Sequence, residues 1–413
     1  MKKLAIIGTG IAGMSAAYFL KDEYEVTLFE KNPYIGGHTH TVTFNGTAFD
    51  TGFMVFNFET YPLLKKLLEQ INAPIMKTDM SFSVQNKRSG LEFCGSGISG
   101  LFSQKRNLFR PSYYKMLLEI DRFNKQAPSN LEKMPEMSIS EYQKAHHHSE
   151  EFLENYLIPM AGAIWSTPFS KMLDFPAKTL IQFFKNHGLL GLDSHYQWYT
   201  IQGGSWQYRD KLIAGFKEKI SVSSGVKSIQ RLKNSAVITL VDHSKYEFDK
   251  VIIATHADEA LTLLQSPTPE EKELLSPFKY QENMAYIHTD PTIMPEIPKN
   301  WSAWNFRYEN NDSKEASTTT YWMNKLQSLK TDQQYFVTIN PSQSIDQKKI
   351  LKTIQYHHPL FDLNAITAQR DLFSLNHDGP LYFCGSYFRY GFHEDALLSS
   401  FNLASFLLDR EVL

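Results

Sequence analysis

The feature that most constrains this chain is a glycine turn at residues 8–13, which read Gly-Thr-Gly-Ile-Ala-Gly. A short apolar run, Lys3–Ile7, precedes the turn, and helix-forming residues occupy Met14–Leu20 after it. Apolar and polar residues then alternate over Glu25–Phe29. These patterns predict a strand, a tight turn, a helix and a second strand, which is the opening of a Rossmann-like α/β fold.

The G-x-G-x-x-G spacing of this turn predicts a dinucleotide site. Gly8 permits the turn, Gly10 lets a pyrophosphate approach the backbone, and Gly13 lets helix and strand pack closely. Ile11 and Ala12 open the helix, whose N-terminus faces the phosphates.

A carboxylate stands where such a site needs one. Glu30 ends the second strand, 22 positions beyond Gly8. There it can accept hydrogen bonds from ribose hydroxyls, and its charge disfavours a 2′-phosphate. An accidental glycine-rich turn is the alternative, but the complete strand–helix–strand context favours dinucleotide binding.

The composition excludes several classes of protein. The 413 residues allow two or three domains, and Lys+Arg 42 against Asp+Glu 44 leaves no general basic field for nucleic acid. Only Cys94 and Cys384 occur, which argues against a disulfide framework and fits a reducing compartment. No run of 18 apolar residues occurs, so we expect a cytoplasmic protein, with attachment to the inner face of a membrane left open. The consecutive His146–His148 face different directions and have no identifiable carboxylate or thiol partner, so no metal site is expected.

Further glycine turns narrow the choice of dinucleotide. Gly36-Gly37 follows Glu30 by six residues, and a strand over Phe49–Phe53 enters another turn at Gly52. With the first turn, these residues resemble the N-terminus of the flavin-containing amine oxidase and phytoene desaturase superfamily. The resemblance implies FAD in an extended pose, contacted by Glu30, Lys31, Gly36, Gly37, His38, Met54 and Val55.

The C-terminus supplies the distant contact that an extended FAD requires. Leu381–Cys384 predicts a strand, Gly385-Ser386 a turn, and Ser399–Leu408 a helix with acids near its start. An ordinary capped terminal helix is the alternative. In the superfamily this helix N-terminus lies against the flavin N1 and C2=O edge, which implies contacts from Gly385, Ser386, His393, Glu394, Asp395 and Ala396. Tyr387, Tyr390 and His393 are the candidates to line the flavin face as catalytic residues, with loop packing as the other interpretation.

A middle segment completes the predicted cofactor domain. Phe248–Ala254 reads as an apolar strand, and the resemblance implies that Val226 contacts the adenine through its backbone. We therefore predict a discontinuous FAD-binding domain over residues 1–72, 200–265 and 370–413. A mixed α+β, amine oxidase-like substrate domain is expected over 73–199 and 266–369.

A more specific resemblance covers most of the chain. It is to a bacterial subgroup of predicted NAD/FAD-binding proteins, and it rests on Gly36–Thr39, Phe53–Asn57, Ile158–Ser166, Asn186–Leu190, Trp304-Asn305, Tyr321–Asn324 and Gly391–Asp395. Such proteins are similar to the oxidase region of plant cyclopropane fatty acid synthases. The similarity implies an acyl-lipid substrate and a lipid methyltransferase as partner.

Two stretches of the predicted substrate domain bear on this substrate. Apolar residues in Tyr156–Trp165 and Leu180–Leu192 are numerous enough to wall an acyl tunnel, although plain core packing is the commoner role. Lys105, Arg106 and Arg110 stand among apolar and aromatic residues, a mixture that suits either an anionic membrane surface or a solvated basic loop.

Three functions fit these observations. The leading one is an FAD-dependent oxidoreductase that removes hydride from an apolar, fatty-acyl or lipid substrate, giving desaturation, oxidation or double-bond isomerisation. The second is a flavin amine oxidase that yields imine and H₂O₂. The third is a non-catalytic flavoprotein partner of a lipid methyltransferase. The sequence does not determine the oligomeric state.

Overall fold

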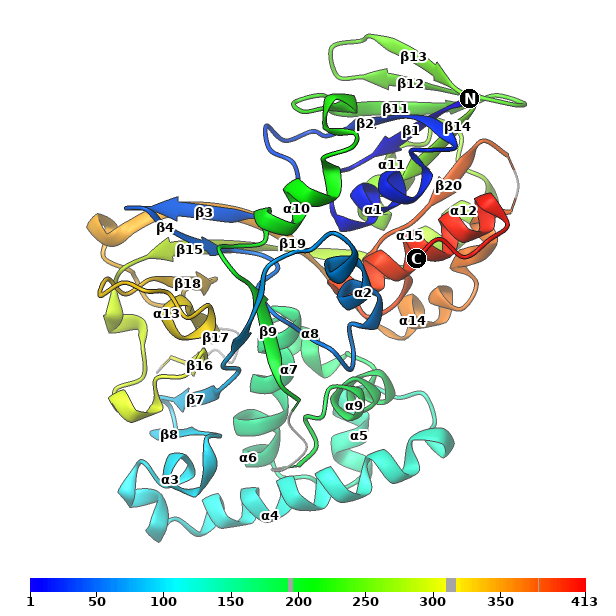
Figure 1. Cartoon of the computed structure of the whole chain (residues 1–413). Helices are drawn as coiled ribbons and strands as arrows, with labels where there is room; N and C mark the ends of the chain where they lie inside the picture. The colour runs from blue at the N-terminus through cyan, green and yellow to red at the C-terminus, as the bar shows by residue number, and fades with distance from the viewer. Residues whose placement is uncertain (192–195, 310–316, 378) are drawn as a thin grey trace. The chain divides into compact units, whose positions relative to one another are not determined.

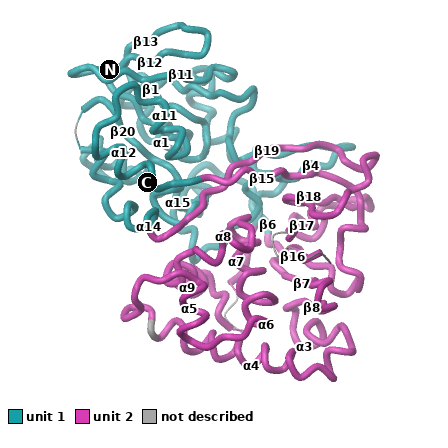
Figure 2. Tube along the Cα trace, turned by 180° about the vertical axis from the view of Figure 1, so that it is seen from behind, with its two compact units in different colours: residues 1–76, 200–279, 364–413 teal, residues 77–199, 280–363 magenta. Residues whose placement is uncertain are grey.

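The computed structural model describes residues 1–191, 196–309, 317–377 and 379–413. The chain divides into two compact units, which Figure 2 shows in different colours. Unit 1 comprises residues 1–76, 200–279 and 364–413, and unit 2 comprises 77–199 and 280–363. The boundaries expected after 72, 265 and 369 therefore lie after 76, 279 and 363.

Local packing explains two of these displacements. Helix α12 (Pro269–Leu275) packs on α11 (Ala257–Leu263), and its buried Glu271 pairs with Arg231, so this segment stays with unit 1. The Gln369 side chain, at the end of α14 (Leu363–Gln369), donates to the Tyr387 carbonyl at 2.9 Å. Both contacts join residues that are separated in sequence, so no local sequence pattern predicts them.

The core of unit 1 is a parallel sheet of five strands in the order β10-β2-β1-β14-β20 (Figure 1). Its strands are β1 (Lys2–Ile7), β2 (Tyr24–Phe29), β10 (Ile220–Ser221), β14 (Lys250–Ile253) and β20 (Leu381–Phe383). Every neighbouring pair is parallel. The carboxyl ends of the strands therefore meet at one edge of the sheet, where α/β folds bind their ligands. The predicted α/β fold is confirmed.

Two helices from opposite ends of the chain pack together in unit 1. Helix α1 (Ile11–Leu20) is buried along nearly its whole length and lies against α15 (His393–Leu408). A buried hydrogen bond of 2.6 Å joins Ser15 Oγ to Ser400 Oγ. Small side chains such as Ala16 and Ala17, both fully buried, let the backbones approach closely.

Smaller elements complete unit 1 and lead into unit 2. They are β3 (Thr41–Phe44), β4 (Thr47–Asp50), β5 (Phe56–Asn57), α2 (Pro62–Gln70), β6 (Ile75–Thr78), β9 (Trp198–Ile201), α10 (Trp206–Ile213), η4 (Lys217–Lys219), β11 (Val226–Arg231), β12 (Ala236–Leu240), β13 (Lys245–Phe248), η8 (Leu372–Asn376) and η9 (Ser386–Phe388). The chain passes from one unit to the other along β6 and β9.

Unit 2 is built on a mixed sheet of seven strands in the order β19-β15-β18-β17-β16-β7-β8. The strands are β7 (Phe82–Asn86), β8 (Leu91–Cys94), β15 (Lys279–His288), β16 (Trp304–Tyr308), β17 (Ser317–Trp322), β18 (Phe336–Ile339) and β19 (Ile350–Leu360). Its helices include α3 (Gly97–Leu101), η1 (Lys105–Phe109), α4 (Pro111–Gln126), η2 (Pro128–Lys133), α5 (Ile139–Ala145), α6 (Glu150–Phe152), η3 (Leu153–Leu157), α7 (Ile158–Trp165), α8 (Phe169–Leu173), α9 (Ala177–Asn186), η5 (Pro291–Ile293), η6 (Pro298–Asn300), α13 (Met323–Leu326) and η7 (Gln347–Lys349).

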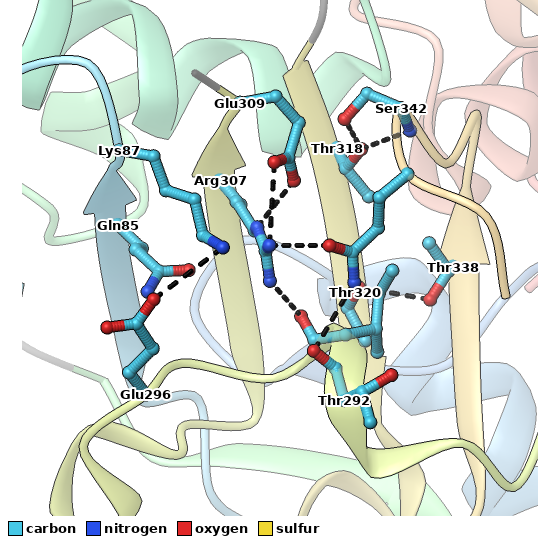
Figure 3. A network of polar contacts seen from close by, with 12 residues as sticks. Gln85, Lys87, Thr292, Glu296, Arg307, Glu309, Thr318, Thr320, Thr338 and Ser342 are labelled. Carbon is cyan, nitrogen blue, oxygen red and sulfur yellow. Dashed lines mark hydrogen bonds and ion pairs between the residues drawn. The ribbon is translucent and has the colours of Figure 1, made fainter.

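The two faces of this sheet differ in chemistry. One face carries a buried polar network in which Arg307 pairs with Glu309 and donates to Gln343, while the hydroxyls of Thr320 and Thr338 lie 3.0 Å apart (Figure 3). The other face carries apolar residues such as Phe306, Val337 and Ile339, and α7 packs on it through β16. Because side chains alternate along a strand, the register places Thr320 and Thr338 on the first face and Thr319 and Ile339 on the second. The first face also carries Phe336, which belongs to a buried apolar cluster.

The apolar stretches expected to wall a tunnel pack mostly on one another. The ring of Trp165 lies 4.7 Å from those of Phe175 and Phe183, and Leu157, Ile158 and Phe184 are at most 1 % exposed. Leu192, at the end of the second stretch, lies outside the described residues. Within the described ranges, no helix has the length and hydropathy needed to cross a membrane.

Candidate functional site

The glycine turn at the end of β1 has the geometry that its spacing predicts. Gly8 adopts a left-handed conformation with φ +98°, and its N–H donates to the Phe29 carbonyl at 2.9 Å. A side chain at Gly13 would place Cβ 2.0 Å from the Gly8 carbonyl oxygen. These two glycines are therefore required by the packing of strand against helix.

Gly10 differs from its neighbours, because an ideal Cβ there would meet no protein atom within 4 Å. Gly10 is also the N-cap of α1, and no side chain caps the first turn of that helix. Its Cα lies 3.2 Å from the Cβ position of Gly37, which is left-handed with φ +57°. Two glycine backbones thus border open space at a helix N-terminus, an arrangement suited to a pyrophosphate.

Glu30 lies at the end of β2, buried to 4 % exposure, and its carboxylate is already well bonded. One oxygen accepts from Thr9 N at 3.0 Å and Thr9 Oγ1 at 2.6 Å, and the other accepts from Asn32 N and Nδ2 at 2.9 and 2.8 Å. These donors occupy the roughly four acceptor positions of a carboxylate. Ribose hydroxyls would therefore have to replace the two side-chain donors, while the backbone bonds hold the carboxylate in place.

Residues 221–226 run beside the Glu30 loop, as the interpretation of Val226 as an adenine contact requires. Ser224 N donates to the Glu30 carbonyl at 2.7 Å, and Ser223 N donates to the Asn32 carbonyl at 2.9 Å. The Cβ position of Gly225 is 3.5 Å from the Lys31 Cβ. Val226 follows directly as the first residue of β11, so it lies on the same side of the site as Glu30 and Lys31.

Thr9 joins the first glycine turn to the second. Its hydroxyl donates to Glu30 and accepts from Gly36 N at 3.2 Å. Beyond Gly37, the carbonyl of His38 accepts from Phe53 N at 2.7 Å, which holds the Met54–Val55 segment beside this turn. Met54 is buried and its carbonyl accepts from Thr200 Oγ1 at 2.8 Å.

The C-terminal contact is formed by β20, the Gly385 turn and the start of α15. Gly385 N donates to Ser399 Oγ at 2.8 Å, and Gly391 N donates to the Ser386 carbonyl at 3.1 Å. Gly391 has φ +98°, a conformation that favours glycine. Ala396 is buried in the first turn of α15. β20 is parallel to β14, which lies beside β1, so this turn stands at the same sheet edge as Gly8.

His393, the first residue of α15, is held by three side chains that sequence reasoning left unassigned. Its ring stacks on Phe53, with centroids 3.7 Å apart, and its Nε2 lies 2.9 Å from Tyr208 Oη and 3.2 Å from Thr39 Oγ1. Desolvation lowers the pKa of His393 to about 3, and burial raises the pKa of Tyr208 well above its usual range. A neutral imidazole therefore meets a protonated phenol, and in the tautomer in which Nε2 accepts from that phenol the imidazole proton lies on Nδ1.

His393 Nδ1 has no hydrogen-bond partner among the described residues, so in that tautomer it can donate to a bound group at the start of α15. Thr39 and Phe53 are short-range neighbours of glycine turns, but Tyr208 is 185 residues from His393 and carries no motif.

The two acids after His393 face protein partners. Both oxygens of Glu394 accept at 2.9 Å from Leu63 N and Leu64 N, so this carboxylate caps α2. Asp395 accepts from Phe392 N at 2.9 Å, and burial raises its pKa to about 7. Burial also raises the pKa of Glu394, against the lowering effect of its two backbone bonds. Their contacts with a cofactor stay predictions, and the structure assigns both acids to helix caps.

The two tyrosines named as catalytic candidates have different surroundings. Tyr387 is 1 % exposed and packs on Phe278, with ring centroids 5.4 Å apart, as a core side chain does. Tyr390 is half-buried beneath the Arg389 guanidinium, 4.9 Å from its ring, and burial raises its pKa. Cys384 is fully buried, with its pKa raised to about 12 by desolvation, so its thiol stays protonated. No observation adds to a catalytic role for either tyrosine.

Asp50 is a further structural anchor of the site, and sequence reasoning gave it no role. Its carboxylate accepts from Ser205 N at 2.8 Å, Ser205 Oγ at 2.7 Å and Thr41 Oγ1 at 2.6 Å. Ser205 is the N-cap of α10, the helix that carries Tyr208. Asp50 therefore sets the position of the hydroxyl that bonds His393.

These residues fit an extended dinucleotide. Open backbone at Gly10, an uncapped helix start at Ile11, a carboxylate at Glu30 and a histidine proton at α15 all lie at one edge of the unit 1 sheet. Gly8–Gly13 and Gly36-Gly37 would hold the pyrophosphate, Glu30 the ribose, and the start of α15 the far end of the cofactor.

Unit 2 contains a cavity of about 500 Å³ on the apolar face of its sheet. It is lined by Gly162, Ser166, Thr167, Pro168, Gln281, Phe306, Ser317, Thr319, Ile339, Asn340 and Ser342. None of these side chains is ionisable. Thr319 is 6 % exposed, and its hydroxyl has no hydrogen-bond partner among the described residues.

Comparison with known proteins identifies relatives of the chain. A family model described as flavin containing amine oxidoreductase matches residues 11–325. A 1-hydroxycarotenoid 3,4-desaturase of Flavobacterium sp. (strain P99-3) is 35 % identical over 94 residues, 22 % of this chain and 18 % of that protein. A farnesylcysteine lyase of Arabidopsis thaliana is 24 % identical over 301 residues, 64 % of this chain and 59 % of that protein. The matches thus span less than two thirds of either relative.

Solved structures match over almost the whole chain. A double mutant of putrescine oxidase superposes with a TM-score of 0.75 at 15 % identity, covering 99 % of both chains. A CLA-producing fatty acid isomerase from P. acnes gives 0.67 at 14 % identity, covering 98 % of both. At such identities the likeness is one of fold. The family match, which covers most of the chain, shows more: this protein belongs to the flavin-containing amine oxidoreductase family, and its cofactor is FAD.

Proposed function

We propose that this protein is an FAD-dependent oxidoreductase that acts on an apolar substrate, a fatty-acyl or similar lipid chain, and removes a hydride from it, giving desaturation, oxidation or double-bond isomerisation. The observation that carries the proposal is the uncharged lining of the unit 2 cavity. An alkylamine is a cation at neutral pH, and a site that binds one needs a carboxylate or a cage of aromatic rings. Among the described residues the lining supplies neither, and Phe306 is the single aromatic side chain among them.

The mixed lining suits a lipid with a neutral polar group. Phe306 and Ile339 offer apolar surface, while the Thr319 hydroxyl can bond an ester or amide carbonyl. Long apolar chains also figure in the names of several relatives, among them carotenoid desaturases and a fatty acid isomerase. The resemblance to the oxidase region of plant cyclopropane fatty acid synthases points the same way.

The roles of the chain's own residues follow from their geometry. When bound, FAD supplies the two-electron acceptor that the reaction requires. Gly10 and the start of α1 would bind its phosphates, and Glu30 would orient the ribose. His393, neutral and fixed by Phe53, Tyr208 and Thr39, would hold a proton on Nδ1 at the start of α15 in the tautomer in which Nε2 accepts from Tyr208. Its low pKa makes it a donor of a hydrogen bond without adding positive charge.

Anaerobic stopped-flow measurement of flavin bleaching tests the proposal. The holoenzyme is mixed with acyl phospholipids, polyamines and amino acids in parallel. Bleaching by the acyl lipids alone supports the proposal, whereas bleaching by amines alone would establish an amine oxidase, as the fold match to putrescine oxidase allows. Bleaching by neither class would favour the third function, a flavoprotein partner of a lipid methyltransferase.

A pair of matched variants tests the role of the cavity. Thr319→Val removes the hydroxyl that faces the cavity and keeps the shape of the side chain, so KM for the acyl substrate should rise while kcat changes little. Thr320→Val removes a hydroxyl on the opposite face of the same strand, where it bonds Thr338. This control should lower stability and leave KM unchanged. Equal KM values for all three proteins would place the substrate elsewhere.

A further inference from the structure

Unit 2 exposes an unusual group of large apolar side chains on η1 and the first half of α4. Phe109 is 88 % exposed, Leu118 71 %, Leu108 46 % and Tyr114 42 %, and Ile98 on the preceding α3 is 78 % exposed. Of the twelve exposed large hydrophobic side chains in the described ranges, these five fall within 21 consecutive residues. Single exposed hydrophobics are ordinary, whereas a cluster marks an interaction surface.

Positive charge coincides with the apolar group. Lys105, Arg106, Arg110 and Lys115 fall between residues 93 and 118, where no Asp or Glu occurs, although the whole chain has a formal charge of −2. No ion pair to a carboxylate is formed by these four cations within the described residues. Arg106 and Arg110 instead donate to the carbonyls of Gly90 and Ser89.

The nearest acids on either side are engaged elsewhere. Glu92 is 3 % exposed and accepts from Ile297 N at 2.9 Å and Asn300 Nδ2 at 2.8 Å. Glu119 is 7 % exposed and accepts from Ser149 N at 3.0 Å and Ser149 Oγ at 2.7 Å. The charge of this surface is therefore positive and unbalanced.

The exposed side chains stand on an ordered base. Figure 1 shows α3 beside the start of α4, where Tyr113 Oη donates to the Leu101 carbonyl at 2.8 Å. Tyr113 and Met116 lie in a buried cluster with Val84, Leu91 and Phe93. Tyr114 Oη donates to the Leu108 carbonyl at 3.1 Å, which ties η1 to α4. Because the inner face of α4 is fully used, its outer residues are free to meet a partner.

We propose that this η1–α4 patch, defined as Lys105, Arg106, Leu108, Phe109, Arg110, Tyr114, Lys115 and Leu118, binds the surface of an anionic lipid bilayer. The four cations would approach the lipid phosphates, and Phe109 and Leu118 would enter the interface between head groups and acyl chains. Basic residues interleaved with Phe, Tyr and Leu on an exposed helix face are the chemistry of interfacial binding. The inference concerns unit 2 alone and does not depend on the substrate proposed above.

Vesicle cosedimentation of the holoprotein tests the proposal. Vesicles of phosphatidylcholine alone are compared with an equal mixture of phosphatidylcholine and phosphatidylglycerol. We expect binding to the mixture, weak binding to phosphatidylcholine, and a loss of binding as salt is raised. Lys105→Gln with Lys115→Gln should weaken binding by more than about tenfold, since each cation near an anionic surface contributes measurably. Phe109→Ser with Leu118→Ser should weaken it similarly.

Matched controls separate the patch from general charge and general hydrophobicity. Lys133→Gln with Lys144→Gln removes the same charge from exposed positions elsewhere in unit 2, and Leu351→Ser removes an exposed leucine from β19. Both controls should bind like the unmodified protein. Equal binding by patch and control variants would overturn the proposal. Absence of vesicle binding, with a dimer that Phe109→Ser converts to monomer, would overturn it too and assign the patch to contacts between copies.

Discussion

Added side chains at two glycines of the same turn should have different effects: at Gly13 they should lower the stability of the apoprotein, and at Gly10 they should lower the affinity for FAD. This contrast is the sharpest test of the cofactor site. At Gly13 an ideal Cβ lies 2.0 Å from the Gly8 carbonyl oxygen and 3.0 Å from its carbon, so strand and helix must separate. At Gly10 the backbone is extended, with φ −61° and ψ 174°, and no protein atom lies within 4 Å of the Cβ position.

The magnitudes follow from these distances. Gly13→Ala overpacks a backbone contact by more than about 1 Å, and such overpacking costs roughly 1–3 kcal/mol. In a unit of this size the apoprotein's Tm should fall by roughly 2–4 °C per kcal/mol. Gly10→Val changes only a helix N-cap, which costs about 1 kcal/mol or less. Its two added methyl groups occupy the space beside the phosphates, so FAD affinity should fall by at least about 100-fold, equivalent to about 3 kcal/mol.

Thermal unfolding of the apoproteins and titration with FAD, followed by flavin fluorescence, measure the two effects separately. We expect Gly13→Ala to lower Tm more than Gly10→Val does, and Gly10→Val to abolish FAD binding while the apoprotein stays folded. Gly10→Ala, with a single added carbon, serves as an intermediate control. Full retention of FAD by Gly10→Val would refute the reasoning, as would a Gly13→Ala protein as stable as the Gly10 variant.

Three further predictions concern the acids and the C-terminal turn. Glu30→Gln should destabilise the apoprotein by about 1–3 kcal/mol, because the amide nitrogen must face backbone donors from Thr9 or Asn32; a urea midpoint equal to that of the unmodified protein would contradict this. Asp395 has a pKa of about 7 in the folded state against 3.8 ordinarily, so between pH 3.8 and about 7 the folded chain binds more protons than the unfolded chain does. The free energy of unfolding should therefore fall as pH rises from about 4 to 7, with a slope of at most about 1.4 kcal/mol per pH unit, and Asp395→Asn should flatten that slope in urea titrations. Gly391→Val forces a β-branched residue into φ +98° and should shift the start of α15, so the variant should retain some FAD with a lower flavin reduction potential and slower reduction. A xanthine oxidase-coupled titration measures that potential, and an unchanged value with unchanged reduction rate would make the turn a structural cap.

Much of unit 1 could be predicted from local patterns. The first strand, turn and helix were expected over Lys3–Leu20 and occupy Lys2–Leu20, because glycine spacing and apolar alternation are properties of neighbouring residues. Helix α2 likewise spans Pro62–Gln70, where leucines recur at helical spacing. Secondary structure of this kind is determined by the residues of the element itself.

Partners distant in sequence were beyond the reach of such patterns. The family resemblance implied a cofactor contact for Glu394, which stays a prediction, and the structure adds that its carboxylate bonds the first turn of α2, more than 300 residues away. Tyr387 was a candidate either for the flavin face or for loop packing; its flavin contact stays a prediction, and its ring packs in the core against Phe278. In both cases the partner of the side chain is a residue that only the folded chain brings close to it.

The sequence by itself therefore determined the kind of site: a glycine turn, an acid at the end of the second strand and a helix start, whose chemistry follows from residue type and spacing. Only the tertiary structure decided which side chains stand around it. Tyr208 reaches His393 because Asp50 caps the helix that carries it, and Glu30 is bonded by Thr9 and Asn32 before any ribose arrives. Hydrogen bonds are short and directional, so they are set by the positions of whole elements, and those positions depend on packing across the entire sheet.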